Sequence, residues 1–162
     1  MKPDRNFFQI QVAITLYCAW NARDLVGAWQ HSSFDRYNWL IMIVWLLPLL
    51  FLKHITKNRL TSEKTELLYT GAGLLFSFTG VIGSLNVLEH VALALVIAGW
   101  MPFSWIQIAW LLSAISWMPA LGWIGTRLFL DHILLVRSLF SIIGSGLIVY
   151  HIQTQRQRDK CI

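Results

Sequence analysis

Long runs of apolar residues, separated by short polar clusters, constrain this sequence more than any other feature. A helix of a soluble protein shows one apolar stripe and one polar face, whereas these runs are apolar on every side. The composition agrees, because 56% of the 162 residues are hydrophobic and only 13% are charged. A soluble domain carries about twice that charged fraction. The sequence therefore predicts that lipid surrounds the chain.

A window of about 19 residues predicts about six membrane-spanning helices. In chain order they cover residues 7–26, 37–52, 67–85, 87–100, 104–117 and 128–152. The first run has no Ala-x-Ala-like cleavage site and is expected to be retained as a helix. The predicted fold is an all-α, polytopic transmembrane bundle, and residues 1–162 form a single transmembrane domain.

Small residues occupy one face of the third predicted helix. Gly73 and Ser77 are four residues apart, as are Gly80 and Ser84, so close helix packing is expected on that face. We therefore expect this helix at the centre of the bundle. Gly144-x-Gly146 in the sixth helix is a second predicted packing surface.

Lysine and arginine positions orient the bundle, because cytoplasmic loops retain positive charge during insertion. Six spans place nine of the 13 basic residues on the side of both termini, namely Lys2, Arg5, Lys53, Lys57, Arg59, Lys64, Arg156, Arg158 and Lys160. Both termini are therefore predicted to face the cytoplasm of a bacterial inner membrane. Since orientation explains the basic residues, no nucleic-acid partner is expected.

Polar residues gather at the other end of the predicted bundle. Near the first two helices they are Arg23, Asp24, His31, Asp35 and Arg36. The candidate cluster for a substrate or partner comprises Glu89, His90, Arg127, Asp131, His132 and Arg137. Arg137 lies roughly 10 Å deeper than the helix start, where a charge costs several kcal/mol unless it is paired. We expect Glu89 or Asp131 to be its partner.

These residues also have structural explanations. Arg127 and Asp131 are four residues apart and can form a surface ion pair on one helix. Glu89 begins a predicted helix, where a carboxylate complements the positive end of the helix dipole. Arg137 can tie two helices together without any further role.

Nine tryptophans are the other unusual feature of the sequence. Tryptophan is enriched where a membrane meets water. Those near the ends of predicted spans are Trp29, Trp39, Trp100, Trp105 and Trp117. We expect an aromatic belt rather than a ligand-stacking site.

The residue pattern does not predict an enzyme. Cys18 and Cys161 are too few for a disulfide framework or a four-thiolate metal site. His-Glu-x-x-His, Cys-x-x-Cys and Gly-x-Ser-x-Gly motifs do not occur in the sequence. We therefore predict no catalytic residue, no metal and no cofactor.

Several short motifs follow one another in a defined order. They are Ala28-Trp29-Gln30-His31, Asp35-Arg36-Tyr37-Asn38-Trp39, the basic stretch from Lys53 to Lys64, Leu88-Glu89-His90 and Trp117-Met118-Pro119. In this order the chain resembles the amino-terminal part of exosortase and archaeosortase-type membrane proteins. The transpeptidase chemistry of that family is expected to need an exterior-facing cysteine with arginine and histidine on later helices. Cys18 and Cys161 do not match, so the resemblance implies a catalytically incomplete relative.

The predicted function is that of a small integral membrane subunit or accessory factor of a larger complex. Its expected partners are the lipid bilayer and either other membrane chains or further copies of itself. One alternative is a small-solute transporter or channel, because Pro48, Pro102 and Pro119 break helices around an Arg/Glu/Asp cluster. Another is a haem- or quinone-binding subunit, in which the histidines at matching depth are His90 with His132 and His54 with His151.

Overall fold

The computed structural model describes residues 5–33, 35–51, 63–101, 105–122, 127 and 132–158. Within these ranges the regular elements are all helices, which confirms the predicted all-α class. Some residues singled out in the sequence lie outside the described ranges. They are Lys2, residues 53–62 of the basic stretch with His54, Pro102, Asp131, Lys160 and Cys161.

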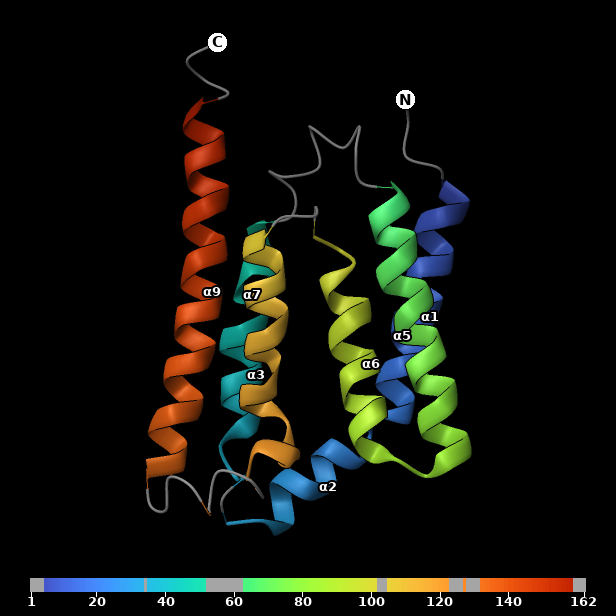
Figure 1. Cartoon of the computed structure of the whole chain (residues 1–162), viewed down its shortest axis with the longest axis vertical. Coiled ribbons are helices and arrows are strands. Elements are labelled where there is room, and N and C mark those ends of the chain that lie inside the picture. Colours follow the sequence, from blue (N-terminus) through green and yellow to red (C-terminus); the bar gives the residue numbers. More distant parts are fainter. Residues whose placement is uncertain are drawn as a thin grey trace.

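Six helical legs run along the long axis in the described part of the chain (Figure 1). They are α1 (Arg5–Asn21), α3 (Asn38–Leu46) with the 3-10 helix η1 (Leu47–Phe51), α5 (Glu63–Gly83), α6 (Asn86–Ala98), α7 (Trp105–Ser113) with the 3-10 helix η3 (Ala114–Trp117), and α9 (Ile133–Arg158). The shorter helix α2 (Asp24–His31) lies across one end, called here the α2 end. α1 begins and α9 ends at the opposite end, so successive legs alternate in direction.

The boundaries of the first two predicted spans differ from the helices observed. The first span was expected to reach residue 26, but α1 ends at Asn21 and α2 begins at Asp24. Arg23 lies between them with its guanidinium carbon 4.9 Å from the centre of the Trp20 ring, and Asp24 supplies a carboxylate to the first turn of α2. In the second span, α3 gives way to 3-10 geometry at Leu47, next to Pro48, which has no N–H to donate.

The legs form two groups of three helices. α5 and α6 pack closely and α1 packs against both, whereas α3 and α7 pack against α9. The two groups lie side by side in Figure 1, and α6 and α7 form contacts between them. Since α1 and α3 are consecutive legs that belong to different groups, the chain must cross between the groups at the α2 end, and α2 makes that crossing.

α6 is the central helix, so the prediction that the small-residue helix α5 would be central is wrong. Along α6 the buried residues are His90, Ala92, Leu93, Ala94, Val96, Ile97 and Ala98. α5 instead turns its small face toward α6: a methyl group at Gly73 would overlap the side chain of Val96. At Gly80 it would come within 2.7 Å of Glu89 Cγ. The glycines therefore serve close packing of α5 on α6, as expected, from a peripheral position.

α5 ends in a Schellman motif. Ser84 has a φ of 51°, in the left-handed region. The Leu85 N–H donates to the Gly80 carbonyl at 2.9 Å, and the Ser84 N–H donates to the Val81 carbonyl at 3.4 Å. Glycine is the usual residue at this position because a Cβ there costs about 1–2 kcal/mol. The motif produces the tight turn that sends the chain back into α6.

Three tryptophans lie in the core of the second group of helices. The Trp45 and Trp110 rings stack with centroids 4.5 Å apart and an interplanar angle of 12°. Each indole N–H donates to the backbone carbonyl of the other residue at 2.9 Å. Trp117 packs against Trp45 at 5.6 Å and is fully buried. Its predicted place in an aromatic belt is therefore wrong, because its ring packs in the interior.

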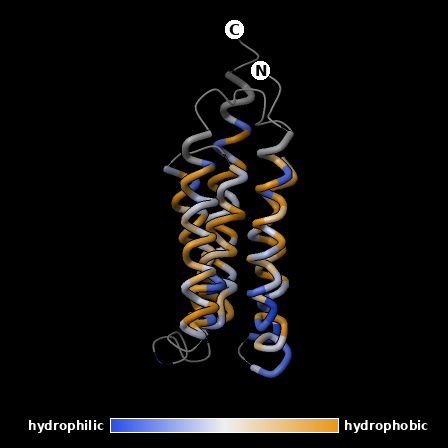
Figure 2. The backbone as a smooth tube through the Cα atoms, turned by 90° about the vertical axis from the view of Figure 1, so that its right-hand side faces the viewer, coloured by the Kyte–Doolittle hydropathy of each residue, from blue (hydrophilic) through white to orange (hydrophobic). Residues whose placement is uncertain are grey.

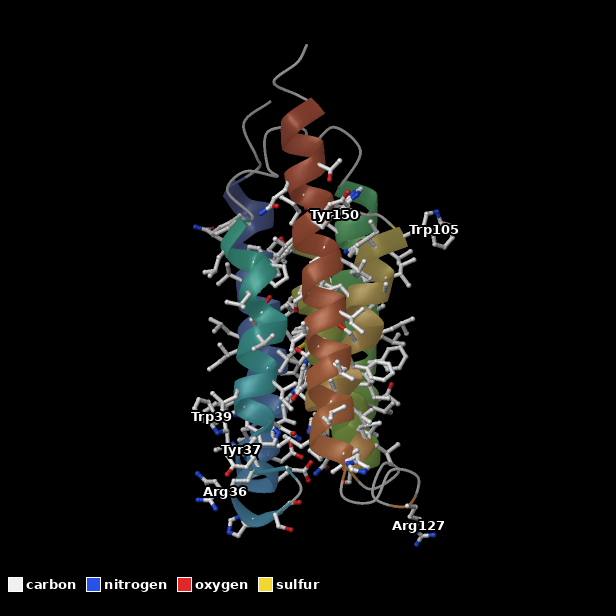
Figure 3. All side chains as sticks on the ribbon, turned by 90° about the vertical axis from the view of Figure 1, so that its left-hand side faces the viewer. Arg36, Tyr37, Trp39, Trp105, Arg127 and Tyr150 are labelled. Atoms are coloured by element: carbon white, nitrogen blue, oxygen red, sulfur yellow. The ribbon has the colours of Figure 1, made fainter. Side chains whose placement is uncertain are left out.

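Other aromatic residues do face outward at both ends of the legs. Trp39 and Tyr37 project from the foot of α3 near the α2 end, and Trp105 and Tyr150 project near the opposite end (Figure 3). Trp29 and Trp100 are half-buried. The Trp29 indole N–H donates to the carbonyl of Trp117 at 3.3 Å, and the Trp100 indole N–H donates to the hydroxyl of Thr15 at 3.1 Å. Outward-facing aromatic residues therefore lie near both ends of the long axis of the bundle.

Two helices in the described part of the chain, Glu66–Gly83 and Ile133–Thr154, are long and apolar enough to cross a membrane. The shorter apolar helices are Asn38–Leu50, Asn86–Ala98 and Trp105–Trp117. Hydrophobic residues colour much of the length of the legs, and hydrophilic residues gather near the α2 end (Figure 2). Apolar residues therefore occur along the other legs as well as along the two longest helices.

Candidate functional site

The described residues of the predicted polar cluster lie at or near the α2 end, but they form two clusters rather than one. Arg137 lies near the start of α9 and pairs with Asp35, which lies between α2 and α3. His90 lies near the start of α6 and pairs with Asp24 at the start of α2. One cluster therefore belongs to each group of helices.

The Arg137–Asp35 cluster consists of Asp35, Asn38, Gly122 and Arg137. Arg137 Nη2 lies 2.7 Å from Asp35 Oδ1, and the arginine side chain is completely buried. The Asn38 side-chain amide donates to the same carboxylate oxygen at 2.9 Å. A methyl group at Gly122 would come within 2.5 Å of Arg137 Nη2 and 2.8 Å of Asp35 Oδ1. Gly122 therefore leaves the space that this ion pair occupies.

The prediction that Arg137 has a carboxylate partner is confirmed, but Asp35 fills this role in place of Glu89. Glu89 is on α6 in the other group of helices, with its side chain against Gly80 of α5. Asp131, the other expected partner, lies outside the described residues. Asp35 was recognised as part of the polar end of the bundle, and its pairing with Arg137 depends on how α3 packs against α9.

Several buried polar atoms around this cluster have no hydrogen-bond partner among the described residues. They are Nε and Nη1 of Arg137, Oδ1 of Asn38, and the Ser116 hydroxyl and Trp117 indole N–H on η3, which packs on α3 and α9. Most buried polar atoms in proteins have a partner, often an ordered water. This part of the bundle therefore has unused capacity for hydrogen bonds.

The His90–Asp24 cluster consists of Asp24, Asn86 and His90. His90 Nε2 lies 3.1 Å from both carboxylate oxygens of Asp24, and the Asn86 side-chain amide donates to Asp24 Oδ2 at 2.8 Å. His90 is buried, and its Nδ1 has no partner among the described residues. These bonds join the start of α2 to the start of α6.

Two further residues of the predicted cluster lie on the surface. The side chains of Arg127 and His132 are exposed, and Arg127 projects from the α2 end (Figure 3). The structure therefore brings neither of them into the buried Arg137–Asp35 cluster.

The described residues offer little of the chemistry that an enzyme needs. Cys18 is buried in α1 and forms a hydrogen bond with Ser77 of α5. A cysteine nucleophile requires a partly exposed, electropositive setting. In the described ranges, no group of three or more His, Cys, Asp or Glu residues is arranged to hold a metal ion. The arrangement can bind charged and hydrogen-bonding groups, but it does not provide a nucleophile activated by a base.

Comparison with protein-family models, with curated proteins and with solved structures gives no match for this chain. The resemblance to the amino-terminal part of exosortases therefore stays a prediction based on the short motifs. The function has to be argued from the fold and from the two polar clusters.

Proposed function

We propose that the chain is a multi-pass inner-membrane protein that acts as a small subunit or accessory factor of a larger membrane complex. All six legs would cross the membrane, and both termini would face the cytoplasm. The polar α2 end would then lie on the exterior side.

The main observation in favour of membrane insertion is that α9 buries polar and small residues and exposes large apolar ones. Its buried face includes Arg137, Ser141, Gly144 and Ser145 in its first half, together with Ile133, Ile148 and Ile152. Its outer face exposes Leu135, Leu139, Phe140, Ile142 and Ile143. In water the exposed apolar side chains would contribute nothing to folding through the hydrophobic effect, whereas in lipid, polar residues face the interior of the bundle and apolar residues face outward.

The other long leg repeats this pattern. α5 buries Ser77 and Thr70 and exposes Leu68, Leu75 and Ile82, the last with 81% of its surface accessible. Contiguous exposed apolar surface of this kind marks contact with a membrane or with a protein partner. α5 and α9 are also long enough to match the roughly 30 Å hydrocarbon layer, and the shorter α6 is shielded between its neighbours.

Packing in the second group of helices favours a subunit over a transporter. The stacked Trp45 and Trp110 rings fill the contact between α3 and α7, and both are fully buried. Their reciprocal hydrogen bonds fix the two helices together. A solute pathway through this group would require those bonds to break, whereas a subunit that packs against a partner needs no such opening.

The histidines give less support to a haem-binding role. His90 uses Nε2 in its contact with Asp24 inside the first group of helices. His132, its expected partner, is exposed just before α9 in the second group. Ligation of one haem requires two rings that face each other at one iron, which this arrangement does not provide.

The resemblance to exosortases adds one element to the proposal. A catalytically incomplete relative would bind a partner or substrate segment at the exterior end without cleaving it. The buried position of Cys18 supports the lack of a nucleophile there.

The test is purification of the tagged chain from its native membrane in a mild detergent. Mass spectrometry of the eluted fraction would identify co-purifying chains, and an absorbance spectrum would detect a bound chromophore. A stoichiometric partner chain would support the subunit proposal. A monodisperse, colourless monomer that carries out solute flux in vesicles would contradict it and favour transport.

A further inference from the structure

A shallow groove lies between α3 and α9. Its volume is about 140 Å³, and it is lined by Leu40, Ile41, Val44, Ser138, Ser141 and Ile142. Both of the neighbouring helices expose apolar residues beside it, including Leu40 on α3 and Ile142 on α9. If the chain lies in a membrane as proposed above, this groove faces the hydrocarbon layer.

The polar atoms in and below this groove are already used within the bundle. The Ser141 hydroxyl donates to the Ile41 carbonyl at 3.1 Å. One turn further along α9, the Ser145 hydroxyl donates to the Val44 carbonyl at 3.0 Å. The groove therefore offers mainly hydrocarbon to an occupant.

A positive charge lies at the foot of the groove near the α2 end. Asn38 and Arg137 each lie about one turn from the lining residues Ile41 and Ser141 along their own helices. Arg36 is exposed at the foot of α3, and Arg127 is exposed on the other side of α9 (Figure 3). Because Arg137 and Asp35 neutralise each other, the exposed Arg36 supplies the net positive charge at the foot of α3.

Outward aromatic residues mark the depth at which a headgroup would lie. Tyr37 and Trp39 are exposed next to Arg36, at the same end of α3 (Figure 3). Aromatic side chains of this kind lie at the level of lipid headgroups. A lipid tail in the groove would therefore place its headgroup beside Arg36.

From this geometry we infer that the groove between α3 and α9 binds a phospholipid with a net negative headgroup. One acyl chain lies along Leu40, Val44 and Ile142, and the phosphate lies beside Arg36. The groove is too small for a helix of a second copy, whose diameter is about 10 Å. The positive charge at its foot favours an anionic lipid over a zwitterionic one.

The experiment measures lipid binding to the full-length, delipidated protein by native mass spectrometry, with phosphatidylglycerol and phosphatidylcholine of identical acyl chains. We expect phosphatidylglycerol to bind about fivefold more tightly, since one basic residue near a membrane surface contributes about a factor of five. Arg36→Gln should remove most of this preference. Arg23→Gln, which neutralises an arginine at the α2 end beside Trp20, is the matched control and should leave the preference unchanged.

A second pair of variants tests the tail site. Val44→Phe places a ring in the groove and should weaken binding of both lipids about tenfold, because the ring overlaps the space that the tail needs. Ile43→Phe changes an exposed residue of the same helix that does not line the groove, and should leave binding intact. If Val44→Phe does not fold, Leu40→Trp blocks the groove from an exposed position.

Equal binding of the two lipids by the wild-type protein would overturn the inference, as would equal effects of Val44→Phe and Ile43→Phe. The proposed membrane location has a separate readout, which is resistance of the chain to extraction from membranes by alkaline carbonate. Release by carbonate would contradict membrane insertion, whereas resistance combined with equal lipid binding would contradict only the lipid site.

Discussion

Removal of one member of the Arg137–Asp35 pair should destabilise the bundle more than any surface substitution. The two side chains are 2.7 Å apart, and their exposed fractions are 0% for Arg137 and 9% for Asp35. At an effective dielectric constant of about 20, unit charges roughly 4 Å apart attract by about 4 kcal/mol. Loss of one member also leaves the other charge buried without a partner. We expect Asp35→Asn and Arg137→Gln each to lower the free energy of unfolding by about 3–5 kcal/mol.

The double variant separates this explanation from a simple loss of packing. With both charges removed, no unpaired charge stays buried, so the double variant should be less destabilised than the sum of the two single variants. Intrinsic tryptophan fluorescence during heating in detergent reports the unfolding temperature. A loss of 3–5 kcal/mol corresponds to a decrease of roughly 10 °C.

An exposed arginine provides the control for this series. Arg36→Gln removes an exposed charge next to Asp35 in the sequence and should change stability by no more than about 0.5 kcal/mol. Strictly additive effects of Asp35→Asn and Arg137→Gln would refute the reasoning. So would single variants that unfold at the same temperature as the control.

Three further substitutions test helix packing by the same thermal assay. Ser84→Gly should stabilise the protein by about 0.5–1 kcal/mol, because glycine adopts the left-handed φ of 51° without strain; a lower unfolding temperature would contradict this. Gly73→Ala should lower the free energy of unfolding by about 1–3 kcal/mol, because its methyl group meets Val96 on α6. Gly71→Ala is the control: Gly71 has open space around it, so this variant should be neutral or stabilising. Trp45→Phe should lower the free energy of unfolding by about 1–2 kcal/mol, because it removes the indole hydrogen bond. An unchanged unfolding temperature would contradict the importance of that bond.

Hydropathy predicted the legs well because it depends on local composition. The legs from α5 to α7 with η3 correspond to the predicted spans within a few residues. The last span was predicted to end at residue 152, but α9 continues to Arg158, and residues 128–131 of that span are outside the described part of the chain. The helix that was missed, α2, has only eight residues and begins with Asp24. A window of membrane-spanning length averages such a segment with its apolar neighbours. The polar pair Arg23-Asp24 was visible in the sequence and marks the place where α1 gives way to α2.

Tertiary pairing was harder to predict than the helices. Asp35 and Arg137 are far apart in the sequence, and four carboxylates, those of Asp24, Asp35, Glu89 and Asp131, were available at the same end of the predicted bundle. Which carboxylate pairs with Arg137 depends on which legs become neighbours. The order of apolar and polar residues along the chain does not specify this. The same limit applies to Trp117, which lies at the end of a predicted span but turns its ring inward.

The position of α2 explains why the polar residues form two clusters at one end. Asp24, at the start of α2, accepts hydrogen bonds from residues of α6 in the first group of helices. Trp29, within α2, donates to the carbonyl of Trp117 in the second group. Asp35, after α2, pairs with Arg137 of α9, also in the second group.

Asp24 at the first residue of α2 and Asp35 after its end are therefore each fixed to a different group of helices. If the chain lies in a membrane as proposed, apolar contacts between its helices provide little directional preference, because lipid tails are as apolar as the side chains. Polar bonds that α2 makes to both groups do have direction, and they fix how the groups are placed relative to one another. It follows that a partner bound at the α2 end would meet the element that joins the two groups.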